Sequence, residues 1–140
     1  MVRMNYLLDT NIILEYLLDQ EKSNEVETFF REIESQVLFL SEFSLYSLGI
    51  ICNKRKKDEA FLLFLTDAII TSIIRVLILD KNDYADLMIA LKRFRLDFDD
   101  AYQYTLGKKF NLQIINYDSD FDRTDCHRMT PADVLFSLDC

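Results

Sequence analysis

The stretch that decides the fold is residues 6–14, which read Tyr6-Leu7-Leu8-Asp9-Thr10-Asn11-Ile12-Ile13-Leu14. The apolar run at residues 6–8 stops at Asp-Thr-Asn, and apolar residues then recur at helical spacing. This pattern predicts a buried strand that leads into a helix, with Asp9 at the end of the strand. In open parallel sheets, ligands bind outside the carboxyl ends of the strands, so we expect Asp9 to face a binding crevice.

Asp9 has an alternative role as the cap of that helix, because an aspartate side chain satisfies the free N–H groups of a first helical turn. Thr10 or Asn11 can cap the same helix, and either would leave Asp9 free to face the crevice.

Apolar strands and helical patterns alternate along the rest of the chain. Further strands are predicted at residues 37–40, 75–79 and 112–116, with a weak fifth at residues 126–129. Helices are predicted from Ser23 to about residue 35, from residue 42 into the basic run 54–57, and over residues 58–73, 82–94 and 101–110. A short last helix begins at Pro131. Such alternation predicts one α/β domain, residues 1–140, with a parallel sheet and helices on both faces.

The composition narrows the class of protein. The 140 residues are 50% hydrophobic with two glycines and one proline, and the net charge is −8. This charge excludes a generally basic nucleic-acid-coating protein, so a phosphate-bearing partner needs a local positive patch or metal ions. We expect a soluble cytoplasmic protein with no membrane partner, because neither a signal peptide nor a membrane span is recognisable.

Carboxylates recur where strands end or helices begin. They are Asp9, Glu42, the group Asp97, Asp99 and Asp100, and the group Asp118, Asp120 and Asp122. Parallel strands end at one edge of a sheet, so these groups can meet there. A hard cation such as Mg²⁺ or Mn²⁺ would neutralise them and hold water that can attack a phosphodiester. The alternative is that each acid caps a helix or lies in a solvated loop.

Four segments together resemble PIN domains, and in particular bacterial VapC-type toxins. They are residues 7–12 (LLDTNI), 97–104 (DFDDAYQY), 114–121 (IINYDSDF) and 129–135 (MTPADVL), in this order over essentially the whole chain. The resemblance implies a three-layer α/β/α sandwich around a central parallel sheet. It also implies an endoribonuclease that uses Mg²⁺ or Mn²⁺, the toxin of a type II toxin–antitoxin pair. An RNA substrate, an antitoxin protein and a homodimer follow as expected partners.

The same resemblance assigns roles to individual residues. It makes Asp9, Asp100 and Asp118 the catalytic metal ligands, with Asp120 as a substitute for Asp118. Polar side chains beside the site, Asn11 and Asn116, are assigned to substrate binding. The basic run that contains Lys54 and Arg55 is a candidate phosphate contact, although it also suits the negative end of a helix dipole. Tyr102 and Tyr104 are candidates for stacking on bases or for packing in the core.

Glu42 departs from the family pattern, which places a glutamate one turn inside the third helix. It lies about one helical turn early, and we expect it to serve the first turn of that helix rather than a metal. The alternative function is therefore a PIN-like module with a degenerate metal site that binds RNA or protein without catalysis. A receiver-like phosphoacceptor domain fits less well, because no suitable lysine follows the last strand.

Overall fold

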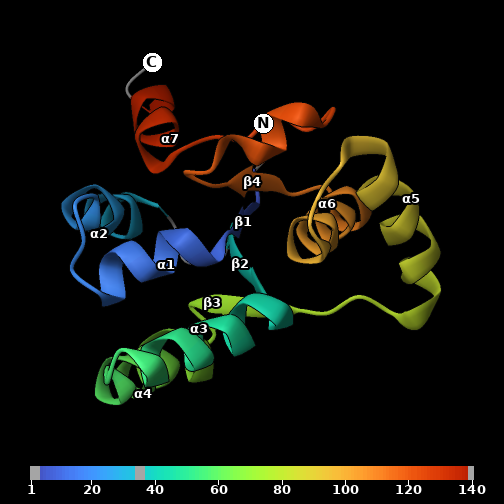
Figure 1. Ribbon diagram of the computed structural model, residues 1–140. Helices are drawn as coiled ribbons and strands as arrows, with labels where there is room; N and C mark the ends of the chain where they lie inside the picture. The colour runs from blue at the N-terminus through green and yellow to red at the C-terminus, as the bar shows by residue number, and fades with distance from the viewer. Residues whose placement is uncertain (1–3, 34–36, 139–140) are drawn as a thin grey trace.

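A four-stranded parallel sheet forms the centre of the molecule (Figure 1). The computed structural model describes residues 4–33 and 37–138. Its strands are β1 (Tyr6–Leu8), β2 (Leu38–Ser41), β3 (Ile74–Leu77) and β4 (Gln113–Ile115), in the spatial order β3-β2-β1-β4. The central β1 pairs with both β2 and β4, so Leu7 lies opposite Phe39 on one side and Ile114 on the other.

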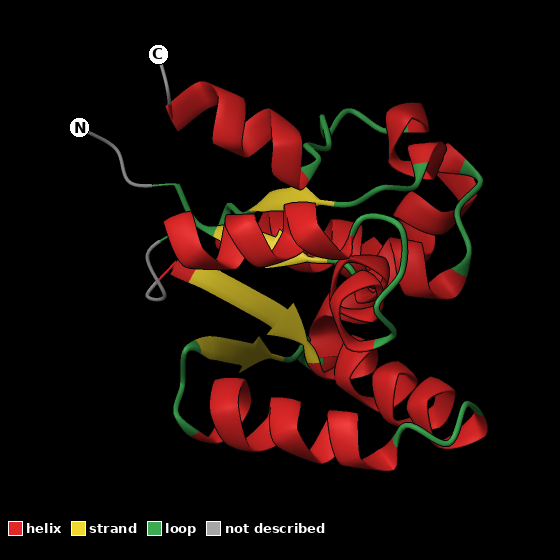
Figure 2. Ribbon diagram, turned by 90° about the vertical axis from the view of Figure 1, so that its left-hand side faces the viewer, coloured by secondary structure: helices red, strands yellow, loops and turns green. Residues whose placement is uncertain are grey.

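Helices cover both faces of the sheet (Figures 1 and 2). Their bounds are α1 Thr10–Leu17, α2 Ser23–Glu32, α3 Glu42–Lys54, α4 Asp58–Phe64, α5 Tyr84–Phe94, α6 Phe98–Phe110 and α7 Pro131–Leu138. Shorter helical turns lie at Leu65–Ile70, Lys81–Asp83 and Ser119–Arg123. Across residues 4–33 and 37–138, no helix combines the length and apolar character that crossing a membrane requires.

The side chains of β1 pack into two separate hydrophobic cores, because successive residues of a strand point to opposite faces of the sheet. Leu8 packs with α1, α2, α3 and α7 through residues such as Ile12 and Phe29. Leu7 packs on the other face with α5 and α6 through residues such as Leu87 and Leu106. The predicted three-layer α/β/α architecture with a parallel central sheet is therefore confirmed.

The elements differ from their predicted bounds where tertiary pairing decides them. The helix predicted over residues 58–73 ends at Ile70, and its last part, Leu65–Ile70, is a π-helix. The expected fifth strand is reduced to a single parallel bridge between Ile115 and Met129. Residues 34–36, which the second predicted helix reaches, lie outside the described part of the chain, and α2 itself ends at Glu32.

Two helix starts differ in how they are capped. Ser23 is the first residue of α2, and the capping position belongs to Lys22, which makes no side-chain capping bond. Asp83 occupies the N-cap position of α5, and the short turn before it is capped by Asp80, in a reciprocal arrangement in which Asp83 accepts the Asp80 N–H. Lys109 of α6 forms ion pairs with both carboxylates, and its Nζ lies 2.7 Å from Asp83. A lysine distant in the sequence therefore stabilises this cap.

Truncation of either core-facing leucine of β1 should destabilise the protein strongly. We expect Leu7→Ala and Leu8→Ala each to lower the free energy of unfolding by about 2–5 kcal/mol, the usual cost of a cavity in a packed core. Ile89→Ala is the control, since Ile89 is exposed on α5 and should change stability by less than about 0.5 kcal/mol. Urea denaturation measures all three. A small effect of either core variant would show that one of the two cores is not formed.

Candidate functional site

Asp9 follows the last residue of β1, and it is buried at the start of α1. Its Oδ2 accepts the Asn11 N–H at 2.9 Å, which makes Asp9 itself the helix cap. The expectation that Thr10 or Asn11 would replace it as cap was wrong, because Asp9 has the extended backbone that a cap needs. The other oxygen, Oδ1, accepts from Gln103 Nε2 of α6 at 2.5 Å. Capping and a place in the site are thus compatible.

The first turn of α6 carries three carboxylates close together. Oxygens of Asp97, Asp99 and Asp100 all lie within 4.8 Å of one another, and this is the group that could hold a metal ion in the described parts of the chain. Asp97 occupies the N-cap position, and its carbonyl accepts the Ala101 N–H. Acidic residues stabilise the start of a helix through its dipole, which explains locally why this turn tolerates three of them.

The loop after β4 is held against α1 by two asparagines. Asn11 Nδ2 donates to Asn116 Oδ1 at 2.6 Å, and the same oxygen accepts the Asp118 N–H at 2.7 Å. Asn11 Oδ1 in turn accepts the Tyr117 N–H at 3.3 Å. Asn116 is fully buried, so the expectation that its side chain binds substrate is corrected: it positions the Asp118 loop.

Asp120 and Asp122 of this loop have basic partners. Arg123 Nη2 lies 3.5 Å from Asp120, and Arg128 Nε lies 3.3 Å from Asp122. The Asp118 carboxylate accepts the Asp120 N–H, and this bond caps the helical turn Ser119–Arg123. Of the two candidate ligands in this loop, Asp118 is the one without a basic partner among the ion pairs of the described residues.

The carboxylates of β1, α6 and the β4 loop act on one another electrostatically. Burial first, and then the negative charges of neighbouring carboxylates, raise the pKa of Asp100 to about 7. Those neighbours are Asp99, Asp9, Asp120 and Asp118. Burial also raises the pKa of Asp9, against the bonds from Asn11 and Gln103, and Asp99 and Asp118 add to the rise. Asp9, Asp100 and Asp118 are thus close enough for their charges to act on one another, although in the described residues the oxygens that all lie within 4.8 Å of one another are those of Asp97, Asp99 and Asp100.

This donor set fits a hard divalent cation. Mg²⁺ and Mn²⁺ prefer oxygen ligands, and several carboxylates gathered without a cation among them repel each other. Within residues 4–33 and 37–138, the buried Gln103 Oε1 has no hydrogen-bond partner, so a further oxygen acceptor lies beside Asp9.

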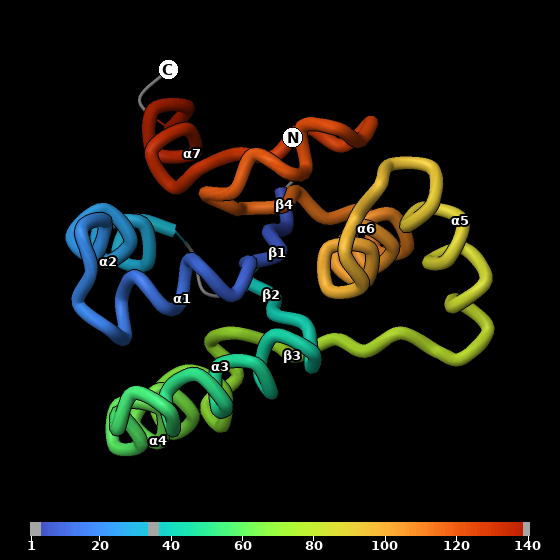
Figure 3. Tube along the Cα trace, in the orientation of Figure 1, coloured from blue at the N-terminus to red at the C-terminus, as the bar shows by residue number. Residues whose placement is uncertain are grey.

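Three candidate residues lie away from this group. Glu42 is the first residue of α3, and its carboxylate accepts the Tyr46 hydroxyl rather than joining the acidic group. Lys54 and Arg55 are at the other end of α3, about 18 Å from Glu42 at the usual helical rise. Figure 3 shows the chain passing directly from β2 into α3 and from β1 into α1.

Sequence reasoning missed Gln103 and did not select Asp99. The spacing of these two residues could have indicated that they belong together. Gln103 lies four residues after Asp99, and residues at this spacing share a helix face. What the sequence does not reveal is the partner: Gln103 reaches Asp9, 94 positions away.

The model of one family, the PIN domain, matches residues 6–126. The chain belongs to the PIN domain family. None of the curated proteins compared matches it.

Solved structures similar to this PIN domain include one described as a toxin and one described as a toxin–antitoxin complex. VapC20 of Mycobacterium tuberculosis, described as a sarcin–ricin loop cleaving toxin, superposes with a TM-score of 0.77 at 16% identity, over 91% of this chain and 100% of that one. FitAcB of Neisseria gonorrhoeae gives 0.73 at 22% identity, over 91% and 98%. A toxin–antitoxin complex of Klebsiella pneumoniae gives 0.71 at 16% identity, again over 91% and 98%. At these identities the likeness shows the fold alone.

The raised pKa of Asp100 predicts how metal-free stability depends on pH. A carboxyl whose pKa is higher in the folded state contributes stability at low pH and loses it as the pH rises toward the folded value. The protein in EDTA should therefore melt at a higher temperature at pH 5 than at pH 8, and Asp100→Asn should remove part of that difference. We expect Asp100→Asn to raise the Tm at pH 8 by a few degrees. Calorimetry measures this.

Asp86→Asn is the control, because it removes the same charge from an exposed position on α5. Asp83 and Asp125 have lowered pKa values, so their contribution to stability is lost as the pH falls. That loss occurs at a lower pH than pH 5, the lower of the two values compared. Mg²⁺ or Mn²⁺ at pH 8 should raise the Tm of the unsubstituted protein more than that of Asp100→Asn. Equal Tm values at pH 8 for the three proteins in EDTA would contradict the electrostatic coupling.

Proposed function

We propose that this PIN domain is a Mg²⁺- or Mn²⁺-dependent endoribonuclease and the toxin of a type II toxin–antitoxin pair. The observation that carries the proposal is the mutual electrostatic effect of Asp9, Asp100 and Asp118, which come from three separate elements at one edge of the sheet. A fold alone needs no such group, and the repulsion costs stability unless a cation is held there.

In this proposal Asp9, Asp100 and Asp118 hold the cation, with Asp99 beside them and Asp120 as a substitute for Asp118. The bound ion would polarise the phosphodiester and supply an activated water for in-line attack. Gln103 and the Asn11 N–H fix the orientation of the Asp9 carboxylate. The bond between Asn11 and Asn116 keeps the Asp118 loop beside α1. Lys54 and Arg55 are assigned to RNA phosphates distant from the cleaved bond.

The proposed partners follow from the relatives. Two of the similar structures are described as a toxin–antitoxin complex and as FitAB bound to a DNA fragment. We therefore propose an antitoxin protein as the regulator of this chain, and RNA in the cytoplasm as its substrate. A neighbouring small open reading frame, co-expressed and co-purified with the chain, would test the first of these.

The rival function is a PIN-like module that binds RNA or protein without catalysis. The observation that favours it is the engagement of Glu42 with Tyr46, which leaves α3 without a carboxylate in the acidic group. Isothermal titration with Mn²⁺ separates the two. Binding that is lost in Asp9→Asn supports the enzyme, and no binding by the unsubstituted protein supports the rival.

Cleavage assays should separate Glu42 from the metal ligands. Asp100→Asn should lower the rate of RNA cleavage by about 100-fold or more, because even outer partners of metal ligands contribute about 10- to 100-fold. Glu42→Gln should leave the rate nearly unchanged and cost a few tenths to about 1 kcal/mol of stability through the helix dipole. A fluorogenic RNA with Mg²⁺ or Mn²⁺ provides the rate. Equal losses in the two variants, with folding intact, would place Glu42 at the metal.

We also propose a homodimer whose interface involves α3 and α4. These helices expose apolar side chains that a monomer leaves in water, namely Tyr46, Ile50, Leu62 and Leu63. Leu62→Glu should convert the dimer into a monomer at micromolar concentration, as measured by light scattering. Ile78→Glu is the matched control, because Ile78 and Leu62 are both 59% exposed but Ile78 follows β3. A monomeric unsubstituted protein would overturn this proposal.

A further inference from the structure

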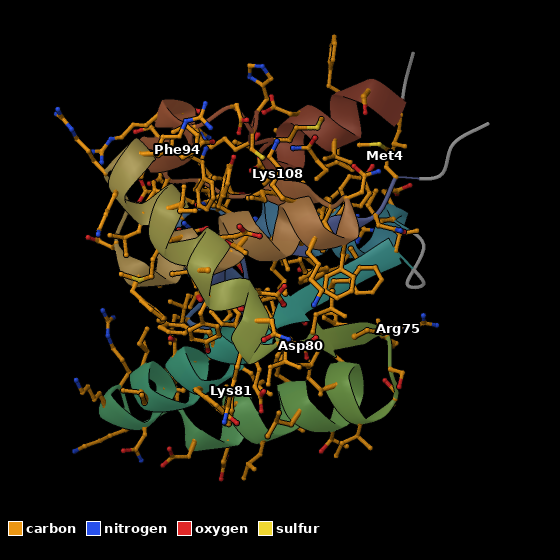
Figure 4. The ribbon with its side chains drawn as sticks, turned by 90° about the vertical axis from the view of Figure 1, so that its right-hand side faces the viewer. Met4, Arg75, Asp80, Lys81, Phe94 and Lys108 are labelled. Carbon is orange, nitrogen blue, oxygen red and sulfur yellow. The ribbon has the colours of Figure 1, made fainter. Side chains whose placement is uncertain are left out.

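An exposed group of aromatic rings adjoins the acidic turn of α6. We call it the aromatic platform and define it as Phe43, Tyr84 and Phe98. Phe98 is 40% exposed and Tyr84 is 39% exposed, whereas Phe43 is half-buried. These residues are in the first turns of α3, α5 and α6. Figure 4 labels Lys81, just before α5, and Phe94, the last residue of that helix.

The rings of the platform pack against one another and against the buried Tyr102. The Phe98 ring lies 6.0 Å from Phe43 and 6.3 Å from Tyr84, measured between centroids. Tyr102 supports both neighbours, at 5.7 Å from Phe43 and 6.4 Å from Tyr84, and its hydroxyl accepts the Leu79 N–H at 2.9 Å. A ring already fixed by its neighbours loses little freedom when a ligand stacks on it.

Tyr102 and Tyr104, which the sequence suggested for base stacking, are not available for it. Tyr102 is buried beneath the platform, and Tyr104 is buried against Phe94 with its hydroxyl donating to Asp125. The accessible face belongs to Phe98 instead. Phe98 and Tyr102 lie one turn apart on the same face of α6, and Phe98 is the more exposed of the two because it is the first residue of the helix.

The position of Phe98 ties the platform to the candidate metal site. Phe98 lies in the chain between Asp97 and Asp99, and its neighbour Phe43 directly follows Glu42. A nucleotide whose phosphate is held at the carboxylates therefore has its own base, or the next one, in the region of this ring.

The charges around the site favour a neutral stacking contact over further phosphate contacts. The arginines of the β4 loop are engaged, Arg123 with Asp120 and Arg128 with Asp122. Asp97 and Asp99 flank Phe98 and repel phosphates, whereas a base carries no charge. Aromatic side chains bind bases by stacking, largely irrespective of base identity, and only unpaired bases offer a free face.

We propose that the aromatic platform is a subsite for one unpaired RNA base, which stacks on Phe98 next to the cleaved phosphodiester. The inference rests on the proposed ribonuclease function. It assigns to Phe98 a contact with an unpaired base of the substrate, and that contact should depend little on ionic strength.

Binding of a short single-stranded RNA that carries one 2-aminopurine tests the subsite, because stacking on a ring quenches the fluorescence of this base. Titrations are run in Ca²⁺, and a gel establishes that the RNA stays intact. Phe98→Leu should weaken binding about tenfold and lose the quenching, whereas Phe98→Tyr should stay within about twofold. The slope of log Kd against log salt should be the same in both variants, because the ring neutralises no phosphate.

Phe110→Leu is the matched control. Phe110 is the last residue of the same helix and is 41% exposed, so the substitution removes an equivalent ring about 18 Å away along the axis. It should bind the RNA like the unsubstituted protein. A duplex of the same sequence should bind more weakly than the single strand, and its affinity should be the same for the unsubstituted protein and for Phe98→Leu.

Several results would overturn the subsite. They are unchanged binding by Phe98→Leu, an equal loss in Phe110→Leu, no binding of single strands by the unsubstituted protein, or a change of oligomeric mass in Phe98→Leu, which would make the platform a protein interface. The proposed activity fails separately, when the unsubstituted protein with Mg²⁺ or Mn²⁺ leaves RNA uncut although it binds the single strand through Phe98.

Discussion

Burying a carboxylate at the end of the central strand is costly, and the surroundings of Asp9 are arranged to limit that cost. A buried carboxylate needs a bond for each oxygen or a nearby cation. One oxygen caps α1 through the Asn11 N–H, and the other accepts from Gln103, which is 3% exposed on α6. Two helices on opposite faces of the sheet are thus oriented around a single side chain, and the approach of α6 brings its acidic turn to the same edge.

Asn11 extends this arrangement to the loop after β4. Its side chain bonds to Asn116 and to the Tyr117 N–H, and Tyr117 donates its hydroxyl to Glu25 of α2. The position of Asp118 therefore depends on α1 and α2 as well as on its own strand. Mutual repulsion pushes the acids apart, and these neutral hydrogen bonds resist it.

The sequence was sufficient for the features that follow from strand order, and insufficient where distant residues compete. Parallel strands must end at one edge, so the proximity of Asp9 and Asp118 could be predicted without knowing any contact. Asp100 lies in the first turn of a helix that follows another helix, and the resemblance to PIN domains selected it. The cap before α5 could not be predicted, because Lys109 selects Asp80 and Asp83 from several polar residues. The role of Gln103 could not be predicted either, because its partner Asp9 is 94 positions away. Which ring of the segment 97–104 faces solvent depends on how far the first turn of α6 extends beyond its neighbouring helices, and the sequence pattern left that open.

The pairing of β1 with β4 has a consequence for the chain during its synthesis. Gln103, which bonds to Asp9, is made 94 residues after it, and Asn116, which bonds to Asn11, is made 105 residues after that residue. A nascent chain that ends before β4 has neither the strand beside β1 nor the loop that carries Asp118. The carboxylates consequently remain apart until β4 and the loop after it have been made, and a product of synthesis interrupted before β4 lacks the assembled centre altogether.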